Sequence, residues 1–207
     1  LLSLQEVNGS DLETSLAEAL QGGNAATGLQ QWQPSGSREL SPDEPFLNLQ
    51  RRLVLGRCGV VDPESLADAL AAGAWQQLAR VLEQNDPAAV TELVRRSGLR
   101  GRGGAGYPTG LKWASVAAMP SSQKVVVCNA DEGDPGAFMD RTLMEGDPHT
   151  LLEGMAIAAF AVGAQQGFIC VRAEYPLAIE RLRTAISAAE QQGWLGRGIG
   201  GSGFSFE

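Results

Sequence analysis

Residues 124–136, KVVVCNADEGDPG, join a short apolar run to a polar turn, and the apolar run predicts a buried strand. A second run, Phe168–Val171 (FICV), has the same character. Between the two runs, residues 148–165 are long enough for a helix and are apolar around most of its surface. Strand, covered helix and strand predict a right-handed βαβ unit with a parallel sheet. We therefore expect an α/β fold in which helices flank a short parallel sheet.

The composition is that of a globular protein, with 43% hydrophobic and 19% charged residues in a chain of 207. The net charge of −8 argues against nucleic acid or an anionic membrane as the main partner, because phosphate groups require a basic surface. Any site for an anion must therefore be a local basic island. The longest apolar-rich run, Leu151–Val162, is too short to span a bilayer, so we expect no direct insertion into a membrane.

The three cysteines, Cys58, Cys128 and Cys170, stand far apart, and His149 is the single histidine. These residues lack the spacing of a zinc or iron–sulfur site, so we expect no metal site in this chain. Free thiols in apolar runs fit a reducing compartment, which predicts a cytoplasmic protein. His149 follows an Asp-Pro pair and is expected in the first turn of a helix, not as a catalytic base.

Helix starts are signalled by Asp-Pro pairs, in which the aspartate caps the helix and proline occupies its first position. The pairs at Asp62, Asp86 and Asp147, a Tyr-Pro pair and the apolar periodicity predict helices over 63–72, 74–83, 87–97, 111–118, 148–165 and 176–192. A further helix is expected at 11–20, followed by a linker at 22–45. The domain plan that we expect is a variable segment at 1–45, a helical part at 46–98 and a ligand-binding α/β domain at 99–207.

Residues 98–113, GLRGRGGAGYPTGLKW, combine six glycines with three cations. Gly101, Gly103 and Gly106 satisfy the pattern GxGxxG, but the preceding residues 88–96 are helical in character, whereas a Rossmann fingerprint requires a strand there. We therefore reject the ordinary Rossmann interpretation. The stretch instead predicts a phosphate cradle, because glycines let backbone N–H groups converge on an anion and Lys112, near a helix start, adds charge. A surface loop of ordinary turn glycines is the alternative.

Aromatic and polar side chains complete the candidate site. Tyr107 and Trp113 are suited to stack on a flat ring. After the first strand, the Asn129 amide can pair with the edge of a heteroaromatic ring, and the Asp131 and Glu132 carboxylates can accept hydrogen bonds from ribityl or ribose hydroxyls. Ligands collect beyond the carboxyl ends of parallel strands, which favours a binding site over a plain polar turn. No catalytic arrangement of side chains is visible, so chemistry would require an imported reactive group.

Four segments then resemble a known family: Arg100–Trp113, Cys128–Arg141, Glu145–Gly154 and Val171–Tyr175. They are similar to the NADH-oxidising FMN flavoprotein subunit of respiratory complex I, and equally to the diaphorase subunits of NAD-reducing hydrogenases and NAD-dependent formate dehydrogenases. The resemblance runs from about residue 46 to the end of the chain. It implies a nonstandard Rossmann-like α/β domain, preceded by a helical segment, in which FMN accepts hydride from NADH and releases electrons to iron–sulfur clusters.

By motif position, the resemblance implies a set of residues around the phosphate and ribityl end of FMN: Gly101, Arg102, Gly103 and Lys112. It implies that Asn129, Asp131 and Glu132 hold ribityl hydroxyls or the flavin edge. For the dinucleotide, it implies that Tyr107 stacks on the NADH adenine, that Gly104 leaves space and that Asp134 contacts NADH. Gly106 completes the glycine pattern of this cofactor site.

The sequence departs from the family in three places. Ser115 stands where many members have a second aromatic platform for adenine, which predicts either weaker NADH binding or a platform supplied from elsewhere. The chain lacks the later glycine-rich segment with paired glutamates, the ubiquitin-like domain and the four-cysteine bundle, so a [4Fe–4S] cluster is expected only in a missing C-terminal region. The first 45 residues do not match complex I subunits, and a ferredoxin-like domain can precede the flavin domain in hydrogenase diaphorases, which favours a hydrogenase subunit.

These observations predict an FMN-dependent NADH dehydrogenase (diaphorase) subunit of a larger complex, with NADH or NAD+ and iron–sulfur subunits as partners. No catalytic side chain and no metal ligand are expected in this chain. Two alternatives stay open: a noncatalytic assembly or scaffold module that retains the fold, and a flavin-free nucleotide-binding module.

Overall fold

The computed structural model describes residues 3–4, 38–39, 45–121 and 123–207. The chain divides into two compact units, Leu1–Arg52 and Leu53–Glu207. In the first unit β1 (Ser3–Leu4) pairs antiparallel with β2 (Arg38–Glu39), and α3 spans Pro45–Asn48. The helix expected at 11–20 and most of the expected linker at 22–45 lie outside the described residues. The division into three parts stays a prediction.

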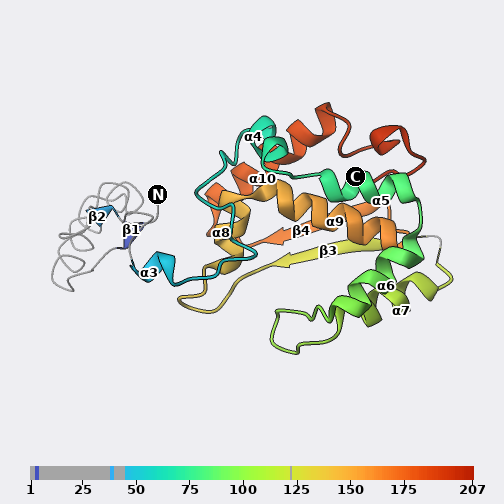
Figure 1. Cartoon of the computed structure of the whole chain (residues 1–207), viewed down its shortest axis with the longest axis horizontal. Helices are drawn as coiled ribbons and strands as arrows, with labels where there is room; N and C mark the ends of the chain where they lie inside the picture. Colours follow the sequence, from blue (N-terminus) through green and yellow to red (C-terminus); the bar gives the residue numbers. More distant parts are fainter. Residues whose placement is uncertain (1–2, 5–37, 40–44, 122) are drawn as a thin grey trace. The chain divides into compact units, whose positions relative to one another are not determined.

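The sheet of the second unit consists of β3 (Val125–Ala130) and β4 (Gln166–Val171), which run parallel and in register along their whole length (Figure 1). The long helix α9 (Pro148–Val162) lies between them in the sequence and packs against both strands. The βαβ arrangement and the α/β fold class are therefore confirmed. β3 continues through Asn129 and Ala130, so the predicted turn begins two residues later than expected.

The other helices of the described part of this unit are α4 (Leu66–Ala71), α5 (Gln76–Gln84), α6 (Pro87–Ser97), α7 (Thr109–Ala118), α8 (Met139–Gly146) and α10 (Pro176–Gln191). The sequence predicted all of these helices except α8. None of the helices in the described ranges combines the length and the apolar character needed to cross a membrane.

Two of the three Asp-Pro helix starts are confirmed. The carboxylates of Asp86 and Asp147 accept hydrogen bonds from first-turn N–H groups of α6 and α9, at 3.0 and 3.3 Å. The start expected at Asp62 is wrong, because α4 begins only after Ser65, whose hydroxyl caps it. The Asp62 carboxylate instead accepts the N–H of Glu64 at 3.0 Å, which forms a local turn.

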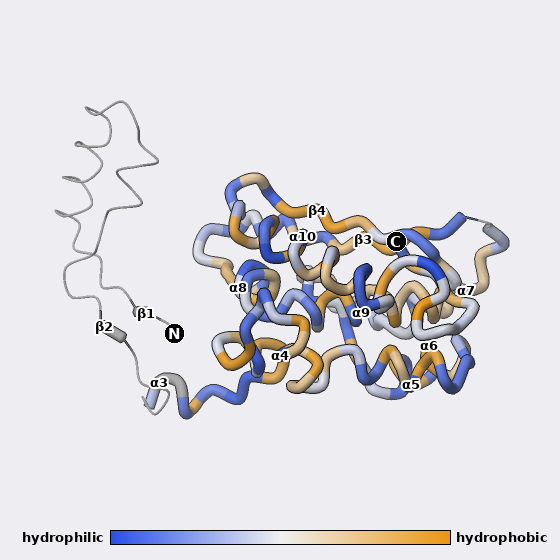
Figure 2. Tube along the Cα trace, turned by 90° about the horizontal axis from the view of Figure 1, so that it is seen from above, coloured by the Kyte–Doolittle hydropathy of each residue, from blue (hydrophilic) through white to orange (hydrophobic). Residues whose placement is uncertain are grey.

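One face of the sheet is buried and the other is not. Val126, Cys128 and Ile169 point toward the core beneath α9 and α10. On the opposite face Val127 and Phe168 are adjacent partners in the register and are 56% and 54% exposed. Figure 2 shows both strands in the hydrophobic colour. Within the described residues, the parallel sheet is thus covered on one side, whereas parallel sheets generally have both faces covered.

The helices α6 and α7 pack closely because Gly110 lies at their contact. Gly110 is buried, and a Cβ built on it would overlap the backbone of Arg95 in α6. Gly154, inside α9, differs in this respect, because a Cβ there would meet no heavy atom within 4 Å.

Gly110→Ala is expected to lower the free energy of unfolding by about 1–3 kcal/mol, because the added methyl group forces α6 and α7 apart. Gly154→Ala is the matched control and should leave the protein equally or slightly more stable, by up to about 1 kcal/mol, because alanine is the better helix former. Urea unfolding of both variants provides the measurement. Equal stability of the two variants would contradict the close packing.

A buried cluster surrounds the start of α9. The His149 side chain is 1% exposed, its ring lies edge-on to Trp75 at 6.2 Å, and its Nδ1 has no partner among the described residues. Trp75 stacks on Trp194 at 5.7 Å. Burial, assisted by the Arg57 guanidinium, lowers the pKa of His149 below its ordinary value against the opposing effect of the Asp147 carboxylate.

Because the folded pKa of His149 is lowered, the unfolded chain binds this proton more readily than the native one. The contribution of His149 to stability is therefore complete above the unfolded pKa of about 6.5 and is lost as the pH falls below it. We expect the free energy of unfolding of the wild type to drop more steeply between pH 7.5 and pH 5.5 than that of His149→Gln. Urea unfolding at each pH gives both profiles, and identical slopes would show that His149 is not buried in its neutral form.

Candidate functional site

The glycine-rich stretch forms a closed loop between α6 and α7. The Thr109 N–H donates to the Leu99 carbonyl and the Gly101 N–H to the Tyr107 carbonyl, both at 2.9 Å. Within the loop Gly104 has φ +95° and Gly106 has φ +61°, left-handed values that favour glycine. The loop therefore needs some of its glycines for its own shape.

The cations of this loop fall into two groups. The Arg100 guanidinium donates to the Gly106 carbonyl at 3.0 Å and so stabilises the loop itself. Arg102 and Lys112 are exposed, and neither side chain makes a hydrogen bond or ion pair with any residue that the structure describes. Because α7 begins at Thr109, two residues earlier than predicted, Lys112 lies in its first turn. Two positive charges thus remain available, one on the loop and one in the first turn of α7.

The two aromatic residues of the stretch have different environments. The Tyr107 side chain is 53% exposed, and its stacking on a ligand ring stays a prediction. The stacking of Trp113 on a ligand ring stays a prediction, and the structure shows the residue half-buried and packed against the core cluster that contains Phe160. The reason is its position one helical turn after the buried Gly110, on the face of α7 that meets the core.

The polar turn begins at the carboxyl end of β3. Asn129, in the strand, accepts the Asp131 N–H on its side-chain oxygen at 3.1 Å, which leaves the amide nitrogen as an available donor. Asn129, Asp131 and Asp134 are all exposed. The structure therefore presents these three predicted residues at the surface, Asn129 near the end of the strand and the two aspartates beyond it.

Glu132 is engaged within the protein. Its two carboxylate oxygens accept the N–H groups of Asp140 and Arg141 at 3.0 and 3.1 Å, at the start of α8. Burial and the Glu132 charge raise the pKa of the Asp140 carboxyl. The Glu132 carboxylate thus stabilises the positive end of α8, a role that the sequence did not indicate. A contact between its remaining lone pairs and a ligand hydroxyl stays a prediction.

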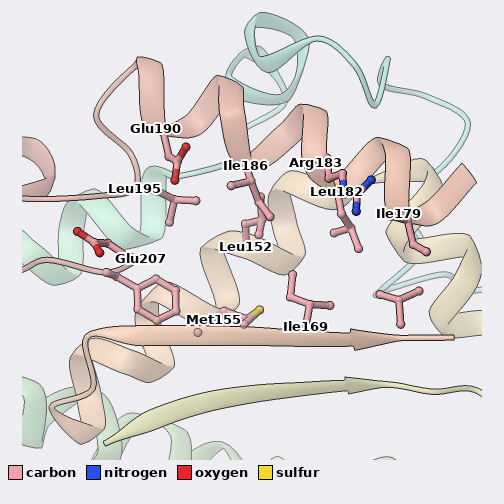
Figure 3. A pocket seen from close by; sticks show the side chains of 13 residues that line it. Leu152, Met155, Ile169, Ile179, Leu182, Arg183, Ile186, Glu190, Leu195 and Glu207 are labelled. Carbon is pink, nitrogen blue, oxygen red and sulfur yellow. The ribbon is translucent and has the colours of Figure 1, made fainter. Parts of the chain in front are cut away.

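The structure also contains an apolar cavity of about 370 Å³ between β4, α9 and α10 (Figure 3). Ile169, Leu152 and Met155 line its floor and Arg183 its rim. At one end the Gly167 N–H donates to the Glu207 carbonyl at 2.7 Å and the Glu207 N–H donates to Gln165, the pattern of a parallel neighbour beside β4. None of the predicted cofactor residues lines this cavity. A common cleft for the glycine loop and the polar turn therefore stays a prediction.

Metal ligation has no candidate cluster in the described ranges, where no three His, Cys, Asp or Glu side chains come together. The sequence did not predict the contacts that Arg172 and Tyr175 make with the polar turn, where both donate to the Glu132 carbonyl. The only signal for them was their place in the motif VRAEY, which carries no periodicity or cap pattern of its own.

Fold and site together define a class: a Rossmann-like α/β domain with a glycine-rich cationic loop before one helix and a polar turn at the carboxyl end of a parallel strand. A comparison with protein families matches residues 94–199 to the Nuo51 FMN-binding domain of the Complex1_51K family. Because the match covers half of the chain, the chain belongs to this family. The family resemblance found in the sequence is confirmed.

Individual relatives come from both complex I and hydrogenases. The chain is 54% identical over 158 residues to the NADP-reducing hydrogenase subunit HndC of Solidesulfovibrio fructosivorans, covering 76% of this chain and 32% of that one. It is 46% identical over 154 residues to an NADH-quinone oxidoreductase subunit of Rhizobium meliloti (strain 1021), covering 74% and 37%. The chain thus spans about a third of the length of these relatives.

A solved structure supports the same fold. The crystal structure of an NAD+-reducing [NiFe]-hydrogenase in the air-oxidized state superposes with a TM-score of 0.59 and 27% sequence identity. The superposition covers 90% of this chain and 29% of the hydrogenase chain.

Glu132→Gln is expected to lower the free energy of unfolding by about 0.5–2 kcal/mol, because it removes the anion and one acceptor at the N-terminus of α8. Asp134→Asn is the matched control, since the exposed Asp134 side chain makes no hydrogen bond within the described residues. Its effect should stay within about 0.5 kcal/mol. Urea unfolding gives both values, and equal losses would contradict the capping role of Glu132.

Proposed function

We propose that this chain is the FMN- and NADH-binding part of a flavoprotein subunit that transfers hydride between NAD(H) and FMN and passes electrons to iron–sulfur clusters of a larger complex. The observation that carries the proposal is a pair of exposed cations that have no partner among the described residues: Arg102 on the glycine loop and Lys112 in the first turn of α7. Membership of an FMN-binding family supports it, as do relatives that are subunits of NADH-quinone oxidoreductases and of hydrogenases.

The residues present fit FMN. A phosphate dianion needs positive charge and backbone access, and Arg102 and Lys112 provide the charge. At Gly103 and Gly104 a Cβ would meet no atom within 4 Å, so the backbone is open to close approach. In our proposal Arg102, Lys112 and the loop glycines, with Gly101, hold the phosphate end of FMN. The Asn129 amide and the Asp131 carboxylate hold the ribityl chain or the flavin edge.

The dinucleotide would bind on the exposed side of the same loop. Tyr107 stacks on the adenine, Gly104 provides space and Gly106 sets the turn of the loop. Asp134 contacts NADH from the polar turn. Ser115, on α7, is exposed and supplies no second aromatic surface.

When bound, FMN supplies the group that exchanges hydride with nicotinamide. The residues of this chain bind and orient the two ring systems, and their role is positioning and electronic tuning. His149 does not act as a base in this proposal, because it is buried against Trp75 at the start of α9. Iron–sulfur partner subunits, a [4Fe–4S] cluster outside this chain and a cytoplasmic location belong to the same proposal.

Lys112→Ala is expected to weaken FMN binding by about 1.5–3 kcal/mol, roughly tenfold to a hundredfold in Kd, because a charged hydrogen bond to the phosphate is lost. Arg80→Ala is the control, since it removes an exposed cation from α5. Quenching of flavin fluorescence on titration gives both Kd values in a polypeptide of the relatives' full length.

Four outcomes of this titration and of a parallel titration with NADH are informative. Loss of affinity in Lys112→Ala alone supports the assignment of the phosphate site. Equal affinity in all three proteins refutes it. A wild-type polypeptide that binds NADH but no FMN would favour the flavin-free nucleotide-binding module, and one that binds neither would favour the scaffold.

A further inference from the structure

The backbone carbonyl of Glu132 accepts hydrogen bonds from two side chains of the segment that follows β4. It accepts a hydrogen bond from Nη1 of Arg172 at 2.7 Å and one from the hydroxyl of Tyr175 at 3.3 Å. Both donors follow directly after β4, whereas Glu132 follows β3 (Figure 1). The polar turn after one strand is therefore tied to the end of its parallel neighbour. We call Arg172 and Tyr175 the carbonyl clamp.

The clamp residues are themselves fixed in place. Tyr175 is buried, at 7% exposure, and two guanidinium groups lie over its ring, that of Arg141 at 5.2 Å and that of Arg172 at 5.5 Å from the ring centroid. The Tyr175 N–H also donates to the Arg172 carbonyl, which closes the turn before α10. Cations over an aromatic face are attracted to it, so the ring helps to orient both arginines.

Arg172 has a second partner, but a looser one. Its Nη2 and Nε lie 3.3 and 3.5 Å from the Glu174 carboxylate, whose side chain is 66% exposed. An exposed ion pair of this kind contributes little, because water and salt screen it. The short contact with the Glu132 carbonyl is therefore the one that constrains the turn.

Fixing this carbonyl also fixes the peptide that contains it. Because a trans peptide is planar, the N–H of Gly133 points away from Arg172 and Tyr175. Gly133 is exposed, and a Cβ there would meet no atom within 4 Å, so the space beside it is open. At the same time the Glu132 carboxylate holds the start of α8. The turn is thus anchored through both the backbone carbonyl and the side-chain carboxylate of Glu132, while the backbone at Gly133 stays accessible.

We propose that Arg172 and Tyr175 are positioning residues for the ligand site: they lock the turn 129–134 in the orientation that presents its exposed amide and carboxylate groups to the flavin. This proposal rests on the proposed function for the identity of the ligand. Neither clamp residue needs to touch the ligand, since each acts through the Glu132 carbonyl.

Hydrogen exchange of the 207-residue chain tests the anchoring without any ligand. In Arg172→Ala we expect amide exchange in residues 131–138 to accelerate at least tenfold, while β3, β4 and α10 exchange as in the wild type. Glu174→Gln is the matched control, because it removes the exposed partner of Arg172 and leaves the carbonyl contact, and it should exchange like the wild type. Unchanged exchange in the turn of Arg172→Ala, or equal acceleration throughout the domain, would overturn the proposal.

FMN titration of the same variants, in a polypeptide of the relatives' length, tests the link to the ligand. We expect Arg172→Ala to raise the Kd at least tenfold, Arg172→Lys to recover part of the loss by restoring a donor, and Glu174→Gln to match the wild type. A wild-type protein that binds FMN with the same Kd as Arg172→Ala overturns the positioning role. A wild-type protein that binds no FMN defeats the proposed function instead, and the exchange result then decides separately whether the clamp orders the turn.

Discussion

The parallel pairing of β3 with β4 is the constraint on which the other features depend. Parallel strands end at the same edge of a sheet, so two segments far apart in the sequence, the turn after β3 and the turn after β4, become neighbours. After β3 the chain must also return to the other end of the sheet before β4 can begin, and α8 and α9 form this connection in the sequence. The contact between Arg172 and the Glu132 carbonyl is possible only because of this geometry.

Helix ends in this domain are secured by side chains from distant elements. The buried Glu153 carboxylate, on α9, accepts the N–H groups of Gln77 and Leu78 at the start of α5. Lys124, just before β3, donates to the carbonyls of Ala117 and Val162 at the ends of α7 and α9. These bonds satisfy backbone groups that would otherwise lack partners. They also link helices that lie far apart in the sequence.

This long-range capping explains which parts of the fold were predictable. Where a capping aspartate precedes proline, at Asp86 and Asp147, the start of the helix was predicted to the residue, although α9 ends three residues earlier than expected. α8 was missed because Phe138, at its N-cap, has no capping side chain, and the carboxylate that stabilises it comes from Glu132. At Asp62 the Asp-Pro pair is present, but the Asp62 carboxylate accepts the N–H of Glu64 in a local turn and does not cap a helix. Sequence patterns thus report local interactions and miss those formed by tertiary contacts.

The same distinction applied to the candidate site. The sequence predicted the site from its segments, because glycines, cations and carboxylates are visible as residue types. It could not tell which of them the protein uses internally. Trp113 belongs to the core, and Arg100 to the glycine loop, because the fold supplies each with a partner.

What remains after these internal partners are assigned is an asymmetric set of groups. Arg102, on the loop before α7, and Lys112, in the first turn of α7, are cations that have no partner among the described residues, while the turn after β3 offers an amide and exposed carboxylates. Exposed and well hydrated, such groups cost the folded chain little when no ligand is bound. A ligand with an anionic group at one end and hydroxyl or ring donors at the other would use both sets. That polarity belongs to a phosphorylated flavin, and a symmetric anion such as free phosphate would engage the cationic loop alone.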